Sequence, residues 1–236
     1  MTKEKEERLR KLRSLVDEHD QRYYKDANPT ISDREYDRIK REMEELEQEL
    51  DPLGLFKQET SSNPDELEQA LPEVGDDRLE EFASHRHLVP MLSLDNTYDE
   101  TEFFEFDQRL KKLFDLNELP YVVEPKIDGV AVSVTYVDGV LKSAVTRGNG
   151  IEGDVITQNL KHVSALPFNL PPLPGMPEVL EIRGEIYMSH EEFIRLNDLR
   201  EQAGLPLYAN PRNLAAGTVK LLDPKEASTR KLEIVL

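Results

Sequence analysis

The chain of 236 residues contains no cysteine. It can therefore form neither disulfides nor a cysteine-ligated zinc site. No hydrophobic run approaches the ~18 apolar residues that a membrane-spanning helix needs. The first residues, 1–13, are dominated by charged side chains and lack the apolar stretch of a secretory signal. The expectation is a soluble, cytoplasmic protein.

Positive charge is scarce as well. Lysine and arginine total 30 against 48 aspartates and glutamates, which gives a formal net charge of -18. Affinity for duplex DNA comes largely from Lys and Arg side chains that neutralise phosphates. This composition argues against independent DNA binding. Hydrophobic residues make up 38% of the chain, and the length allows one large domain or two smaller ones.

Apolar residues three or four positions apart predict a helix over residues 5–24 and a second helix that begins at Ser32. The two apolar stripes are Leu9, Leu12, Val16, His19 and Tyr23, and Tyr36, Ile39, Met43, Leu46 and Leu50. Ser32 and Glu35 fit a capping box, in which each satisfies a free backbone N–H of the first turn. A turn at Asn28-Pro29 joins the helices. Residues 1–54 are therefore predicted to form a helical hairpin domain, and residues 55–77, which lack periodicity, a linker.

The rest of the chain, residues 78–236, is predicted to be an α+β domain. A short amphipathic helix is expected near Arg78, and a strand-rich region from Tyr121. Alternating apolar residues over 130–136, the turn pair Asp138-Gly139 and a return strand over 140–146 predict a β-hairpin. Another strand is expected over 179–188. Ser189 and a glutamate three residues later fit a second capping box, which opens a helix that ends at Gly204.

The segment Glu124-Pro125-Lys126-Ile127-Asp128-Gly129 is the most pronounced chemical motif. In an extended conformation Glu124, Lys126 and Asp128 would share one face, because strand side chains alternate. A lysine acts as a nucleophile only when it is neutral, so the site would also need nearby cations to favour that form. Candidate cations are Arg147, Arg183 and Arg212. The alternative is an exposed strand of ion pairs that ends in a turn.

Three further segments carry polar residues in patterns that suit ligand binding. In Thr146–Gly150, an arginine before two glycines suits the close approach of a phosphate or ribose, although an ordinary loop is an equal alternative. Glu181, Arg183 and Glu185 share a strand face that either lines a cleft or faces solvent. The segment 210–213 is either a ligand-binding turn or simply the start of a helix.

The predicted hairpin carries a polar and aromatic patch. Asp33, Tyr36 and Asp37 share a helix face because they are three and four positions apart. Tyr23 and Tyr24 lie near the end of the preceding helix. Aromatic rings and carboxylates suit a flat, positively charged ring such as nicotinamide. Packing of Tyr36 in the core is the alternative.

Together these motifs resemble those of the NAD-dependent DNA ligases. The matching segments are Asp33–Asp37 (DxxYD), Met91–Asn96 (MLSLDN), Lys126–Gly129 (KxDG), Thr146–Gly150 (TRGxG), Arg183–Glu185 (RGE) and Ala209–Asn213 (ANPRN). KxDG is shared with ATP-dependent ligases and capping enzymes, whereas the DxxYD hairpin belongs to the NAD-dependent branch. The resemblance implies a helical NMN-binding domain followed by an antiparallel-strand-rich nucleotidyltransferase (ATP-grasp-like ligase) domain.

The resemblance also implies roles for individual residues. Lys126 would attack the α-phosphorus of NAD, release nicotinamide mononucleotide (NMN) and carry AMP, with Asp128 acting near the nucleophile and the metal. The nucleotide would be bound by Ser93, Leu94, Glu124, Gly129, Arg147, Glu185, Arg212 and Lys220. The NMN half would be held by Tyr23, Tyr24, Asp33, Tyr36 and Asp37. Lys220 stands where the family commonly has arginine, so the charge is kept but the bidentate fork is lost.

The same resemblance sets expectations for cofactors and partners. Mg²⁺ would support the phosphoryl steps, whereas zinc is not expected in this part of the enzyme. The later lysine motifs, the oligonucleotide-binding barrel, the zinc module and the helix-hairpin-helix region of the family are absent, so the adenylation domain is expected to be incomplete. Nicked double-stranded DNA would be the partner of the full-length enzyme. This acidic part is expected to be a monomer that binds neither DNA nor membrane by itself.

Two other functions remain open at this point. The chain could be a truncated, non-catalytic module that binds NAD or another nucleotide. It could also be a nucleotidyltransferase that uses ATP, although the amino-terminal hairpin disfavours this reading. Formation of a covalent AMP adduct, tried with NAD and ATP side by side, would separate the three hypotheses.

Overall fold

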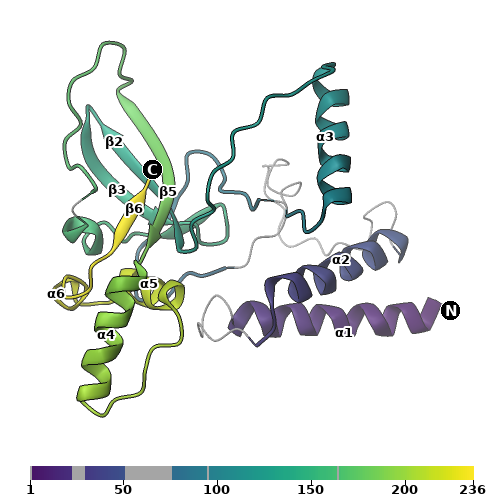
Figure 1. Cartoon of the computed structure of the whole chain (residues 1–236), viewed down its shortest axis with the longest axis horizontal. Helices are drawn as coiled ribbons and strands as arrows, with labels where there is room; N and C mark the ends of the chain where they lie inside the picture. The colour runs from purple at the N-terminus through teal and green to yellow at the C-terminus, as the bar shows by residue number, and fades with distance from the viewer. Residues whose placement is uncertain (1, 23–29, 51–75, 95, 164) are drawn as a thin grey trace.

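The fold is described here from a computed structural model that covers residues 2–22, 30–50, 76–94, 96–163 and 165–236. It combines helices with antiparallel sheet, as predicted. Figure 1 shows a pair of amino-terminal helices on one side and a twisted sheet with short helices on the other. No helix among the described residues is long and apolar enough to cross a membrane.

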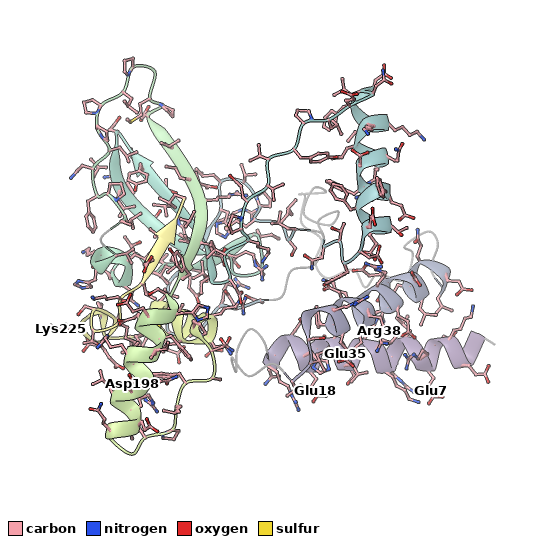
Figure 2. The ribbon with its side chains drawn as sticks, in the orientation of Figure 1. Glu7, Glu18, Glu35, Arg38, Asp198 and Lys225 are labelled. Atoms are coloured by element: carbon pink, nitrogen blue, oxygen red, sulfur yellow. The ribbon has the colours of Figure 1, made fainter. Side chains whose placement is uncertain are left out.

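The amino-terminal helices α1 (Thr2–Asp20) and α2 (Asp33–Leu50) form the predicted antiparallel hairpin. Leu9, Leu12 and Val16 are buried between them, as the apolar stripe requires. The hydroxyl of Ser32 accepts a hydrogen bond from the backbone N–H of Glu35 at 3.3 Å, which caps α2. Ion pairs also link the two helices: Lys5–Glu49, Arg8–Glu42 and Arg13–Glu47. Glu7, Glu18, Glu35 and Arg38 are exposed on the hairpin surface (Figure 2).

Several predictions for this region lie outside the described residues. Tyr23, Tyr24 and the turn at Asn28-Pro29 belong to this group, as does most of the predicted linker. The side chain of Asp33 also lies outside the described part of the structure.

The second domain is built on a four-stranded antiparallel sheet of order β3-β2-β5-β6. Its strands are β2 (Val130–Val137), β3 (Val140–Thr146), β5 (Val179–Tyr187) and β6 (Glu233–Val235). Asp138 and Gly139 turn the chain between β2 and β3 with positive φ angles of 52° and 75°. Positive φ at both central residues matches the twist of a tight hairpin. The predicted β-hairpin is therefore confirmed.

One face of this sheet forms the core. Val130, Val132, Val134 and Tyr136 are buried, in the predicted alternation. They pack with residues of α5 (Pro211–Val219) and of the 3-10 helix η3 (Asn159–His162). The helices α4 (His190–Gln202) and α6 (Pro224–Ala227) complete this side.

The opposite face of the sheet is polar. Residues paired across an antiparallel sheet lie on the same face. Ala131 pairs with Glu185, Ser133 with Arg183, and Thr135 with Glu181. The three charged residues predicted to share a face therefore do so, and they project away from the core.

The start of the second domain differs from the prediction. Residues 79–82 form only a turn, which leads into β1 (Ser84–Arg86) rather than into a helix. Strand β1 pairs with β4 (Glu152–Asp154). The backbone N–H of Leu79 donates to the carboxylate of Asp154 at 3.1 Å, and Arg78 pairs with Asp76 and Glu152. The bonds to Asp154 and Glu152 thus tie this segment to β4, and no helix forms here.

The strand-rich region predicted from Tyr121 has its first strand at Val130. Residues 121–128 belong to no strand. Pro125 has no backbone N–H to donate to a ladder, which disfavours pairing here. The structure therefore shows no paired strand over Glu124, Lys126 and Asp128, and their sharing of one face stays a prediction.

Helix α3 (Glu100–Phe114) was not predicted from the sequence. Asp99 caps it by accepting from the N–H of Glu102 at 2.9 Å. Figure 1 shows α3 apart from the sheet, and it packs closely against none of the other described elements. Its apolar side and the segment after it are exposed, and Val122 and Val123 reach 87% and 93% exposure. We call this surface the α3 apolar surface; it consists of Phe103, Phe104, Leu113, Phe114, Leu116, Tyr121, Val122 and Val123.

Candidate active site

Lys126 lies on the segment that leads into β2, and its side chain is exposed. Three residues later, Gly129 meets strand β5. Its backbone N–H donates to Glu185 Oε1 at 3.1 Å. A Cβ atom at Gly129 would lie 2.1 Å from the carbonyl oxygen of Ile186. Glycine at this position therefore permits the segment that carries Lys126 to approach strand β5 closely.

Glu185 connects the lysine motif with strand β5. Burial raises the pKa of the Glu185 carboxyl, and the charges of Lys126 and Arg212 act in the opposite direction. The Lys126 ammonium and the Arg212 guanidinium are thus the cations near this carboxylate. The KxDG and RGE segments, far apart in the sequence, meet at one place.

Arg212 comes from the start of α5. The side chain of Asn210 accepts a hydrogen bond from the N–H of Asn213 at 2.8 Å, and Pro211 occupies the first turn. This is a standard helix start. Arg212 Nε lies 2.9 Å from Asp128 Oδ1. The fold therefore brings the ANPRN segment to the lysine motif.

The first glycine of the TRGxG segment, Gly148, serves the packing of the chain itself. Gly148 has a φ of 60°, and a Cβ atom there would lie 1.9 Å from the carbonyl oxygen of Glu152. The turn also binds residues 87–91, which lead into the MLSLDN motif and include its first residue. The N–H of Met91 donates to the Gly150 carbonyl at 2.7 Å, and His87 Nε2 donates to the Arg147 carbonyl at 3.0 Å.

Arg183 holds the same segment from the other side. Its guanidinium donates to the carbonyl of Pro90 at 2.9 Å and to that of Val89. It also pairs with Glu181 at 3.0 Å. Sequence reasoning offered Arg183 as a cation for Lys126, whereas the structure places its guanidinium on these carbonyls. Ser93 and Leu94 follow this segment and are exposed.

Lys220 lies in a different environment from the Lys126 group. Its ammonium pairs with Asp154 at 3.0 Å and with Asp77 at 3.3 Å, and its side chain is 10% exposed. The side chain of Asp154 is completely buried. Burial raises the pKa of Asp154, whereas Lys220 lowers it. The structure thus gives Lys220 a role in an internal ion-pair cluster.

The structure describes the side chains of only two of the residues predicted to bind NMN, Tyr36 and Asp37. Tyr36 Oη donates to Asp20 Oδ1 at 2.6 Å within the hairpin. Asp37 Oδ2 accepts hydrogen bonds from Asn96 Nδ2 at 2.8 Å and from the hydroxyl of Tyr98. Asp37 therefore contacts the last residue of the MLSLDN motif and a tyrosine two residues beyond it.

Sequence reasoning did not select four residues that shape these sites: His87, Tyr98, Asp77 and Asp154. None belongs to a local pattern that distinguishes it from other polar residues. Tyr98 and Asp99 follow MLSLDN after one residue, Thr97, and the helix-capping pattern Asp99–Glu102 was the one local signal available. The partners of Asp77 and Asp154 become visible only in the folded chain.

Comparison with protein families supports the motif assignments. Residues 79–236 match the family described as NAD-dependent DNA ligase adenylation domain. Residues 2–53 match the family described as DNA ligase-like, N-terminal NAD+-binding domain. Together the two matches cover most of the chain.

Individual relatives are named DNA ligases. The chain is 51% identical to a protein named DNA ligase 1 from Opitutus terrae over 235 residues, which are 99% of this chain and 33% of the relative. It is 46% identical to a DNA ligase from Petrotoga mobilis over 226 residues, 96% of this chain and 32% of that relative. A DNA ligase from Thermotoga maritima is 44% identical over 231 residues, 98% and 31% of the two chains.

The chain thus spans about a third of the length of the relatives it matches. It contains the amino-terminal NAD+-binding region and an adenylation region, and the fold brings the KxDG, RGE and ANPRN segments together in the latter. The chain belongs to the family of NAD-dependent DNA ligases.

Proposed function

We propose that the chain transfers AMP from NAD⁺ to Lys126 and releases NMN. The observation that carries this proposal is the meeting of Lys126, Asp128, Glu185 and Arg212 at the start of β2. The match to the adenylation family supports it. The reaction class is nucleotidyl transfer with a covalent lysyl-AMP intermediate.

In this reaction the Nζ of Lys126 attacks the α-phosphorus of NAD⁺. A nitrogen–phosphorus bond forms, the phosphoanhydride bond to NMN breaks, and the amine loses its protons. Arg212 at the α5 start would contact a phosphate, since a guanidinium suits phosphate oxygens. Asp128 and Gly129 would help to position the lysine, and their contacts with Arg212 and Glu185 support this role. Glu185 and Arg147 would bind the ribose and phosphates, Glu124 the adenine, and Ser93 and Leu94 the nucleoside.

The carboxylates beside Lys126 suit a magnesium ion. Mg²⁺ is usually held by one or two carboxylates together with substrate phosphates. Asp128 and Glu185 provide two carboxylates, and the described residues contain no cluster of three or more metal-binding side chains. Mg²⁺ would neutralise charge that develops on the phosphates.

The hairpin is proposed to bind the NMN half of NAD⁺ through Asp33, Tyr36 and Asp37, with Tyr23 and Tyr24. In the full-length protein the AMP would pass to the 5′-phosphate of a nick in double-stranded DNA, and a 3′-hydroxyl would then seal the nick. The relatives named DNA ligase support this proposal. The domain boundaries, a role for Lys220 at the nucleotide, the monomeric state, the lack of independent DNA binding and a cytoplasmic location remain predictions.

The test is covalent labelling with NAD⁺ that carries radiolabel in its adenylate half. We expect label on the wild-type chain through denaturing electrophoresis and none on Lys126→Arg. Arginine keeps the charge but has no free lone pair to attack phosphorus, because its guanidinium stays protonated. Lys225→Arg, at an exposed position on α6 (Figure 2), is the matched control and should label normally.

Labelling of Lys126→Arg at the wild-type level would show that Lys126 is not the nucleophile. Binding of NMN without any adduct on the wild-type chain would favour the non-catalytic binding module. An adduct formed from ATP but not from NAD⁺ would instead favour an ATP-dependent nucleotidyltransferase.

A further inference from the structure

The loop that joins α4 to α5 is attached to α4 through the backbone of Tyr208. The Asn197 side chain on α4 accepts a hydrogen bond from the N–H of Tyr208 at 2.8 Å and donates one to its carbonyl at 3.2 Å. An amide side chain can do both at once because it carries an acceptor and a donor side by side. Asn197 therefore pairs with Tyr208 as a second backbone would.

The side chain of Tyr208 is held as well. Its ring packs against the hydrophobic core of the second domain. The guanidinium of Arg200 lies 4.4 Å from the ring centre and that of Arg230 lies 5.6 Å from it, and contacts of this kind are attractive. Figure 1 shows the loop leaving the far end of α4 and returning to α5. Tyr208 is thus the point at which the loop rejoins the domain.

Tyr208 lies four residues before Arg212, which belongs to the first turn of α5. Leu214 and Ala215 are buried in the core, so they fix the body of this helix. The first turn precedes these buried positions, and helix ends fray more readily than helix bodies. The Asn210 cap and the segment that leads into it therefore determine where the Arg212 side chain starts.

The ion pair between Arg212 and Asp128 is better fixed on its Arg212 side. Asp128 belongs to no strand, and its side chain is 73% exposed, whereas that of Arg212 is 25% exposed. Arg212 Nε lies 2.9 Å from Asp128 Oδ1. A shift at the start of α5 would therefore move the guanidinium relative to the KxDG segment.

We propose that Asn197 is a positioning residue for AMP transfer, which places the Arg212 guanidinium at the KxDG segment through Tyr208 and the capped start of α5. This proposal rests on the NAD-dependent adenylation proposed above. Asn197 acts through Arg212, because its own side chain is bonded to the backbone of Tyr208. A guanidinium that serves a phosphate has to be aligned before the reaction, and misalignment lowers the rate.

Asn197→Leu tests the proposal, because leucine has a similar size but neither donates nor accepts a hydrogen bond. One measurement needs no reaction: the NMR signal of the Arg212 Nε–H in chain made with isotope-labelled arginine, assigned by its absence in Arg212→Lys. Pairing with Asp128 should protect this hydrogen from exchange with water in the wild-type chain. Asn197→Leu should lose the protection, and protection at the wild-type level would overturn the proposal.

The rate of adenylation gives a second measurement. The time course of labelling is followed over a range of NAD⁺ concentrations. Asn197→Leu should lower the maximum rate about tenfold, because a charged donor no longer meets the charge that develops on the phosphates. The NAD⁺ concentration for half the maximum rate should change less, since such contacts are strongest in the transition state. An unchanged maximum rate would contradict the positioning role.

A double variant shows whether the effect passes through Arg212. Arg212→Lys keeps the charge but has no Nε–H to place at Asp128. In this background Asn197→Leu should change the rate by less than about twofold, because the residue through which it acts is already altered. A further loss of about tenfold would mean that Asn197 acts by another route, and the proposal would fall.

Thr229→Val is the matched control. The hydroxyl of Thr229 donates to the carbonyl of Glu226 at 2.8 Å, so valine, with nearly the same shape, removes a bond from a side chain to the backbone after α6. Its labelling rate and its Arg212 signal should equal the wild-type values, and urea unfolding compares its stability with that of Asn197→Leu. Equal loss of the Arg212 signal in both variants would show that destabilisation alone releases Arg212, which would overturn the proposal.

The two proposals fail in different ways. If the wild-type chain is labelled from NAD⁺ and Asn197→Leu keeps both the rate and the Arg212 signal, the positioning role is wrong and NAD-dependent adenylation stands. If Asn197→Leu loses the Arg212 signal but the wild-type chain takes no label, the placement of Arg212 by Asn197 is supported. The proposed adenylation is then wrong.

Discussion

At the scale of single residues, His87 combines burial with a hydrogen bond that fixes the chain. The side chain is 8% exposed, and its Nε2 donates to the Arg147 carbonyl. Burial lowers the pKa of His87 from its ordinary value of 6.5, although the bond to Arg147 and the charge of Glu181 oppose this shift. The folded chain therefore favours the neutral imidazole.

This shift predicts a loss of stability in mild acid. A histidine with a lowered folded pKa contributes its full stabilisation above pH 6.5, and the contribution disappears as the pH falls from 6.5 through the folded pKa. Urea unfolding between pH 7.5 and pH 5 measures the effect. His87→Gln keeps a donor for the Arg147 carbonyl but cannot titrate. The two stability curves should diverge below pH 6.5, by at most ~1.4 kcal/mol per pH unit; parallel curves would contradict the assignment.

At the scale of elements, the sequence predicted best where the determining signals are local. The β2–β3 hairpin, the cap at Ser189 and strand β5 follow from alternation, turn residues and capping side chains. The turn at residues 79–82 and the start of β2 at Val130 depend on bonds to β4 and β5, which lie far away in the sequence. No local pattern contains that information.

The same distinction applies to the candidate site. Motif residues such as Lys126 and Arg212 could be selected from the sequence, yet only the fold shows that Arg212 reaches Asp128. Arg183 and Arg212 looked equivalent as candidate cations. The structure separates them, because Arg183 binds the carbonyls of Val89 and Pro90 instead.

The close approach of β2 and β5 at Gly129 predicts the effect of adding one methyl group. In Gly129→Ala the new Cβ meets the Ile186 carbonyl, so the strands must separate. We expect a loss of about 1–3 kcal/mol in the free energy of unfolding, as for other overpacked sites, and slower adenylation because Lys126 is displaced. Chemical denaturation and the labelling assay measure the two effects.

Gly217→Ala provides the matched control. Gly217 lies within α5, and an added Cβ atom would meet nothing within 4 Å. Alanine should stabilise the helix by roughly 0.5–1 kcal/mol. If Gly129→Ala were as stable as Gly217→Ala, the result would contradict the close approach of Gly129 to the Ile186 carbonyl.

At the scale of the whole molecule, the cluster of Lys220, Asp154 and Asp77 joins three distant parts of the chain. Thr146 contributes as well, since its hydroxyl accepts from the N–H of Asp154 at 3.1 Å. Among the described residues, Asp154 Oδ1 is a buried atom without a hydrogen-bond partner. The Lys220 ammonium is therefore the main compensation for a buried carboxylate.

Removal of this ammonium should destabilise the fold. Lys220→Met leaves Asp154 buried without its cation, which typically costs about 3–5 kcal/mol. The double variant Lys220→Met/Asp154→Asn should recover part of that loss, as a coupled pair does. Urea unfolding measures both variants. If Lys220→Met left the stability unchanged but weakened nucleotide binding, the result would support the nucleotide-binding role that the sequence predicts for Lys220.

The α3 apolar surface also has a consequence for the behaviour of the chain at high concentration. Exposed apolar patches promote contact between molecules, whereas a formal net charge of -18 makes copies of the chain repel one another. This repulsion weakens when salt screens it or when acid neutralises the carboxylates. We therefore expect high salt or acid to promote aggregation of the chain through the α3 apolar surface.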